Sequence, residues 1–227
     1  MINEHIKGYI VDLDEMGNLH ITASAPSLER ALKREYEECE IILQDGRKIS
    51  PEQRRKVYAL LGEIAEYVNG IRNSDTVEEA KALMKWEFML KRMESQERRL
   101  FSLSNCDMTT AREFITYLID FIIAEDIPST VSLIDTCEDI SRYVYQCAAH
   151  RKCAVCGREA DIHHMEGSRV QSGNDREEVH HLGRSILPLC REHHIECHNS
   201  EIDFLGKYHL EPITLDEALC KKLKLKK

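Results

Sequence analysis

The sequence predicts an α+β protein, in which a mainly helical N-terminal part with a small sheet precedes a C-terminal part rich in cysteine and histidine. Three observations support this class. Apolar and polar residues alternate over 5–23, as in a β-hairpin. Apolar residues recur at helical spacing over 50–147, between capping signals. Eight of the eleven histidines fall between residues 150 and 198, so this short stretch needs its own explanation.

The first 44 residues combine strand and helix signals. The alternation over 5–23 is interrupted at 15–18 by Glu-Met-Gly-Asn, which is a turn sequence. Ser27 is expected to open a short helix that continues to about Glu38. Residues 39–44 are apolar enough for a third strand.

The middle of the chain carries clear helix signals. Ser50 is followed by Pro51 at the first helical position, and Gln53 completes a capping box, so a helix is expected until Gly70. A last helix of this region is expected from about 130 to 147.

Two further capping boxes predict two more helices. Thr76 pairs with Glu79 in the first box, and Thr110 pairs with Glu113 in the second. A strand is expected between them, at 99–103. The aromatic and methionine positions of these helices recur at helical spacing, which favours a core over a surface that binds nucleic acid.

The charge balance bears on possible partners. The chain has 31 basic and 40 acidic side chains and a net charge of −9, which argues against indiscriminate phosphate binding. Residues 1–147 carry 18 basic and 27 acidic side chains, whereas 148–200 carry 7 and 8, so bound cations would make the second region locally positive. Basic clusters at 54–56, 91–92 and 98–99 are interpreted as solvated faces, with a phosphate-contacting edge as the alternative.

The segment 211–227 is expected to form a C-terminal helix with a lysine-rich end. Thr214 and Glu217 make a capping box, and five lysines follow from residue 221 onward. Positive charge at a helix C-terminus is favoured by the helix dipole. We prefer this interpretation to contact with phosphate.

Nine cysteines without a signal peptide indicate a reducing compartment, in which thiols bind metal or lie buried. No apolar run approaches the ~20 residues of a membrane span. A soluble, cytoplasmic protein is therefore expected.

Two Cys/His pairs, each with a two-residue gap, predict a closed metal site. Cys153 and Cys156 form the first pair, and Cys190 and His193 form the second. Three thiolates and one imidazole are a typical ligand set for structural Zn²⁺. Gly157 permits a tight turn after the first pair. The less favoured alternative is a set of scattered thiols and a surface histidine.

Four further histidines predict a second metal site. His194 and His198 are four residues apart and share one face if this segment is helical. His163 and His164 are adjacent and point to opposite sides if they lie on a strand. One of this pair can therefore join the helical histidines on a metal ion while the other faces a substrate, as in a hydrolytic site.

This order of residues, over 151–209, resembles the HNH endonucleases, whose ββα-metal fold clasps one divalent ion between a hairpin and a helix. The resemblance implies that His164 is the general base that activates water. It also implies that His163, His194 and His198 hold a catalytic ion, which would be Mn²⁺, Ni²⁺, Zn²⁺ or Mg²⁺. Three imidazoles suit the first three ions better than Mg²⁺, which prefers oxygen ligands.

One position departs from the family pattern. The middle asparagine usually lies five residues before the cysteine of the second pair, and this chain has Ser185 there. His180, His181 and Asn174 are candidates for the lost loop-bracing hydrogen bonds, and proximity favours His181.

The chain as a whole is similar to HNH nucleases encoded by phages and prophages of Gram-positive bacteria, which implies a role in DNA replication or recombination in the bacterial cytoplasm. Residues 1–147 also resemble recombination mediators of the lambda Orf (NinB) family, which implies contacts with single-stranded DNA or single-strand-binding protein. We therefore expect a DNA- or replisome-interaction domain at 1–147, an HNH nuclease domain at 148–210 and the C-terminal helix at 211–227. The alternatives are a non-catalytic recombination mediator with a purely structural zinc domain, and a zinc-dependent DNA-binding regulator.

Overall fold

The computed structural model describes residues 8–23, 33, 41, 46–94, 101–168 and 180–226. The chain forms two compact units, 1–44 and 45–227.

The described part of the first unit is an antiparallel hairpin, as the alternation predicted. Strand β1 (Gly8–Leu13) pairs with β2 (Leu19–Ala23) across a turn in which Asp14 Oδ1 accepts the backbone N–H groups of Met16 and Asn18, at 2.9 and 2.8 Å. The helix expected at 27–38 and the strand expected at 39–44 lie outside the described residues, apart from one residue of each.

The second unit begins with α2 (Pro51–Asn69), which has the predicted ends. Ser50 Oγ accepts a hydrogen bond from the Gln53 N–H at 3.0 Å, and Gln53 Oε1 accepts one from the Ser50 N–H at 3.2 Å. Gly70 ends the helix at a φ of 70°, a left-handed conformation that glycine adopts without strain.

The next two helices begin earlier than predicted. They are α3 (Ser74–Glu94) and α4 (Met108–Ala124). The predicted caps Thr76 and Thr110 lie inside the first turns, so these two predictions were wrong. Asn73 Oδ1 accepts the Thr76 N–H at 2.9 Å, and Asp107 Oδ1 accepts the Thr110 N–H at 2.7 Å. Asn and Asp are better N-caps than Thr, and in both cases one stands three residues upstream.

Two other predicted elements were also wrong. Residues 101–103 of the expected strand are not in a strand, and the rest of that segment lies outside the described residues. The helix expected over 130–147 is instead two helices, α5 (Leu133–Thr136) and α6 (Ile140–Ala149). Asp139 caps α6 separately, so the chain starts a new helix there.

A small sheet and three helices complete the second unit. They are β3 (Asp161–His164), β4 (Ser185–Leu189), α7 (Arg191–Asn199), α8 (Glu201–Tyr208), β5 (Ile213–Thr214) and α9 (Glu217–Leu223). β4 is the central strand and pairs antiparallel with β3 and β5. The predicted cap Thr214 was wrong, because it lies in β5 opposite Ser185. Asp216 caps α9 instead, by accepting the Leu219 N–H at 2.7 Å.

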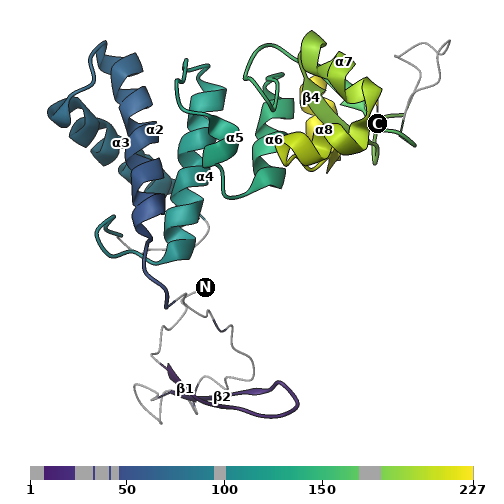
Figure 1. Cartoon of the computed structure of the whole chain (residues 1–227). Coiled ribbons are helices and arrows are strands. Elements are labelled where there is room, and N and C mark those ends of the chain that lie inside the picture. The colour runs from purple at the N-terminus through teal and green to yellow at the C-terminus, as the bar shows by residue number, and fades with distance from the viewer. Residues whose placement is uncertain are drawn as a thin grey trace. The chain divides into compact units, whose positions relative to one another are not determined.

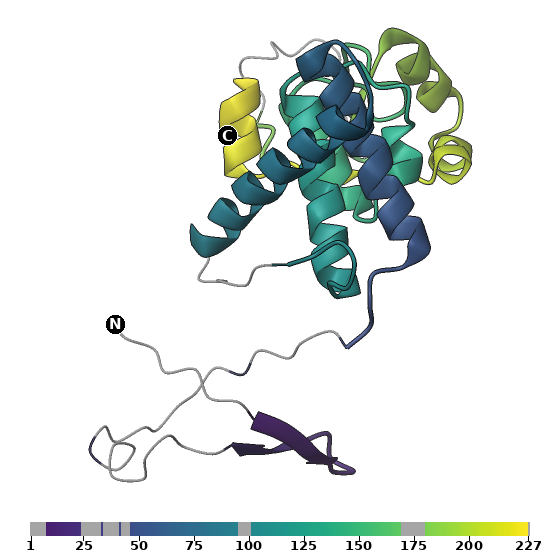
Figure 2. The same cartoon turned by 90° about the vertical axis from the view of Figure 1, so that its left-hand side faces the viewer.

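Within the second unit, α2, α3 and α4 pack together, and α6 joins this helical group to β4 (Figure 1). The turned view shows α2 and α4 side by side (Figure 2). Phe114 and Leu118 of α4 and Leu60 of α2 are completely buried there. The predicted α+β class is confirmed, and the residue pair 147–148, where a domain boundary was expected, lies inside α6. In the described part of the chain, no helix combines the length and the apolar character that crossing a membrane requires.

Candidate active site and metal centres

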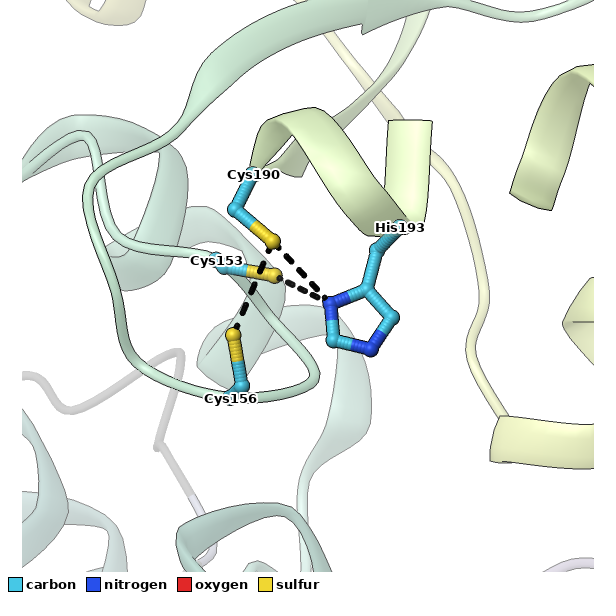
Figure 3. A group of neighbouring side chains, drawn as sticks. All are labelled: Cys153, Cys156, Cys190 and His193. Carbon is cyan, nitrogen blue, oxygen red and sulfur yellow. Dashed lines mark hydrogen bonds between the residues drawn. The ribbon is translucent and has the colours of Figure 1, made fainter. Parts of the chain in front are cut away.

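Three thiols and one imidazole converge where the first Cys pair meets the start of α7 (Figure 3). The Cys156 and Cys190 sulfurs are 3.7 Å apart. His193 Nδ1 lies 3.4 Å from Cys153 Sγ and 3.2 Å from Cys190 Sγ. In a tetrahedron with metal–sulfur bonds of about 2.3 Å, neighbouring donor atoms lie roughly 3.5–3.8 Å apart. The four side chains therefore have the chemistry and close to the spacing of a tetrahedral zinc site.

Local backbone structure explains why these four side chains meet. Gly157 has a φ of 71°, and its N–H donates to the Cys153 carbonyl at 2.8 Å, which closes the turn of the first pair. Cys190 is the N-cap of α7, so His193 follows in the first turn of the same helix. Tyr143 Oη of α6 donates to the buried Ala154 carbonyl at 2.8 Å and fastens the first pair to the helical group.

A positive side chain that the sequence analysis missed lies beside the thiols. Arg158 Nε is 3.3 Å from Cys156 Sγ, and Arg158 Nη2 is 3.6 Å from Cys190 Sγ. The guanidinium also pairs with Glu192. Burial raises the pKa of the Cys156 thiol, but the hydrogen bonds from Arg158 outweigh it, so this pKa lies below its ordinary value. Arg158 thus favours the thiolate, which is the form that binds metal.

A second cluster joins one histidine of β3 to two of α7. The rings of His163, His194 and His198 have centroids 4.6 to 4.7 Å apart, and one nitrogen of each lies within 4.8 Å of the others. His194 and His198 share one face of α7, as their spacing predicted. Three imidazole nitrogens are a donor set that fits Zn²⁺, Ni²⁺ or Mn²⁺.

His163 is buried, with 1% of its surface exposed. Burial, and after it the charges of His194 and His198, lower its pKa to about 4. The imidazole is therefore neutral near pH 7, which is the form that can ligate a metal.

Glu201 is a carboxylate beside this cluster that the sequence analysis also missed. Its Oε1 is 3.4 Å from His163 Nε2, and both carboxylate oxygens accept the Glu166 N–H, at 3.0 and 2.8 Å. Glu201 begins α8. In the sequence, its position three residues after His198 is the only sign that it could lie near the cluster. The carboxylate of Glu196 on α7 contacts Lys207 and not the three-histidine cluster.

His164 lies on the other side of β3 from His163, as alternation along a strand requires. Its Nε2 is 3.1 Å from His181 Nδ1. His181 is buried, and its N–H donates to the Lys226 carbonyl at 3.0 Å.

The chain on either side of 169–179 is held together by Arg184 and Ser168. Arg184 Nε donates to the His180 carbonyl and Nη1 to the Ser168 carbonyl, both at 2.6 Å. The Ser185 N–H donates to Ser168 Oγ at 3.1 Å. Arg184 is a bracing residue that was not predicted, and Asn174 lies outside the described residues.

Two of the basic clusters are engaged in contacts within the chain. Arg54 donates to two backbone carbonyls, at 3.1 and 3.0 Å, and Lys56 lies 3.3 Å from Glu138. Lys91 lies 4.6 Å above the Tyr117 ring. The cluster at 98–99 lies outside the described residues.

A comparison with protein families finds one described as "Putative HNHc nuclease", which matches residues 24–226. A comparison with curated proteins and one with solved structures find no match. The family match covers α2 to α9 and includes both Cys/His clusters.

Proposed function

Because the chain belongs to this HNHc nuclease family, we propose that it is a divalent-metal-dependent endonuclease that hydrolyses phosphodiester bonds of DNA. The placement of His163 and His164 carries the proposal. They stand on opposite sides of β3, one inside a cluster of three histidines and the other against His181. A purely structural zinc domain needs only the four ligands of the first cluster.

The two clusters have different roles in this proposal. Cys153, Cys156, Cys190 and His193 would hold a structural Zn²⁺, and His163, His194 and His198 would hold the catalytic ion. A divalent ion bound there supplies positive charge that stabilises the phosphate and the leaving oxygen.

His164 is the general base. Water is a poor nucleophile, and a neutral imidazole, with an ordinary pKa of about 6.5, can take the proton from attacking water at a ring nitrogen. The neighbouring ring of His181 holds His164 in place on the side of β3 away from the three-histidine cluster. Arg184 holds the backbone next to His181 in place, because its guanidinium donates hydrogen bonds to the carbonyls of His180 and Ser168.

The test compares wild type and His164→Ala for nicking of supercoiled plasmid and of single-stranded DNA, with Mn²⁺, Ni²⁺, Zn²⁺ and Mg²⁺ in turn. Removing a general base lowers a rate by roughly 10²–10⁴-fold. Metal content and DNA binding should stay the same, and the products should carry 5′-phosphates. His20→Ala, an exposed histidine outside both clusters, is the matched control and should cleave at the wild-type rate.

Two results would reject the proposal. One is no cleavage by the wild type with any of the four ions. The other is a wild-type rate for His164→Ala. Either result favours the non-catalytic DNA- or protein-binding alternative.

A further inference from the structure

The C-terminal segment 217–226 runs beside the candidate catalytic histidine. The Lys226 carbonyl accepts a hydrogen bond from the His181 N–H at 3.0 Å. The His181 ring in turn contacts the His164 ring, with Nδ1 and Nε2 3.1 Å apart. His181 therefore connects the backbone of Lys226 to His164, the candidate general base.

Buried side chains fix this segment in place. Leu223, at the end of α9, is 3% exposed, and its carbonyl accepts a hydrogen bond from Arg151 Nη2 at 3.2 Å. The Leu225 N–H donates to the Cys220 carbonyl at 2.9 Å. Lysine and leucine alternate over 222–226. Leu223 is buried and Leu225 is half-buried, whereas all three lysines are exposed.

The charge of this segment differs from that of the N-terminal part. Residues 221–227 contain five lysines and no acidic residue, whereas 1–147 carry 18 basic and 27 acidic side chains. Among the residues that the structure describes, no carboxylate pairs with the ammonium group of Lys221 or Lys224. Lys222 Nζ lies 3.0 Å from His150 Nε2, and Arg54 and Lys56 of the α2 cluster contact oxygen atoms within the chain.

We propose that Lys222, Lys224 and Lys226 form a C-terminal basic edge that contacts DNA phosphates next to the scissile bond. The proposal rests on the proposed nuclease function and adds the surface that holds its substrate. DNA is favoured over an acidic protein because the edge adjoins the candidate site of phosphodiester hydrolysis. Lysine–phosphate contacts supply most of the sequence-independent affinity of proteins for DNA.

The test measures binding of a fluorescent DNA duplex at increasing salt, in a His164→Ala background that keeps the DNA intact. Each phosphate contact contributes about 0.9 to the slope of log K against log salt concentration. Lys224→Gln/Lys226→Gln should therefore make the slope shallower by roughly 1.8 and weaken binding at every salt concentration. Lys224→Arg/Lys226→Arg should keep the slope and the affinity of the parent protein, because arginine retains the positive charge.

The matched control also removes two exposed positive charges. Arg55→Gln/Arg112→Gln changes side chains on α2 and α4 and should leave the slope unchanged. Three results would each overturn the proposal of a basic edge. They are an equally shallower slope in this control, an unchanged slope in the lysine-to-glutamine variant, and no DNA binding by the parent protein at low salt. Failure of the nuclease proposal would appear separately, as intact DNA in the cleavage assay together with the expected change in slope.

Discussion

The imidazole of His181 lies against that of His164, with Nδ1 of the first 3.1 Å from Nε2 of the second. His181 is 3% exposed, and its backbone is held by the Lys226 carbonyl, so its ring has little freedom to move. The orientation of His164 in the proposed mechanism therefore depends on a residue 17 positions away in the chain.

We expect His181→Ala to lower kcat while KM and metal content stay near the wild-type values. The loss should be smaller than the roughly 10²–10⁴-fold cost of removing the base itself, because His164 remains present but is less well oriented. His181→Asn places an amide group near the position of Nδ1 and should recover part of the rate. A purely structural role would instead lower the melting temperature of both variants and leave kcat per folded molecule unchanged.

Cys153→Ser should remove the structural zinc and destabilise the C-terminal part of the second unit. Metal bound at a closed thiolate site contributes about 10–16 kcal/mol in small zinc domains, and that free energy also stabilises their fold. The measurements are zinc content by atomic emission and thermal unfolding by circular dichroism. Cys137→Ser is the matched control, because Cys137 lies outside both metal clusters and its thiol donates to the Ile134 carbonyl at 3.1 Å, a bond that serine can keep.

Zinc retained in Cys153→Ser, with an unchanged melting curve, would contradict the assignment of these four ligands. The same loss of zinc in Cys137→Ser would show that the measurement reports general instability.

The two clusters of potential metal ligands could be predicted because ligand chemistry leaves short-range spacing in the sequence. The two-residue gaps and the four-residue separation of His194 and His198 each correspond to one local geometry, and both are present in the structure. The opposite placement of His163 and His164 follows in the same way from strand alternation.

The supporting residues could not be predicted because their contacts depend on tertiary packing. Glu201 approaches His163 across 38 positions of the chain, and Arg158 approaches Cys190 across 32. Nothing in local spacing distinguishes them from other charged residues. The errors at Thr76 and Thr110 have another cause, since a stronger cap stood three residues upstream of each.

His194→Ala should lose the second metal site and keep the first. The remaining pair, His163 and His198, is a weaker ligand set than three imidazoles, whereas the four zinc ligands of the first cluster are untouched. Equilibrium dialysis with Mn²⁺ or Ni²⁺ should show one binding site fewer than in wild type, at unchanged zinc content. His20→Ala should show no change, and loss of the zinc along with the second ion would mean that the two clusters are not independent.

The choice of catalytic ion should follow the donor set and the contact of Glu201 with His163. Three neutral imidazoles favour Mn²⁺ or Ni²⁺ over Mg²⁺, so cleavage should be faster with the first two ions.

A carboxylate that hydrogen-bonds a ligating histidine orients the ring, and removing such a partner typically costs 10–100-fold in metal affinity. Glu201→Gln should therefore weaken Ni²⁺ binding to that extent in calorimetry, while the absorption spectrum of the bound Ni²⁺ stays the same. Glu196→Gln is the matched control, because Glu196 contacts Lys207 and not the cluster. A changed spectrum in Glu201→Gln, together with faster cleavage by the wild type in Mg²⁺, would mean that Glu201 is itself a ligand and that the three-histidine assignment is incomplete.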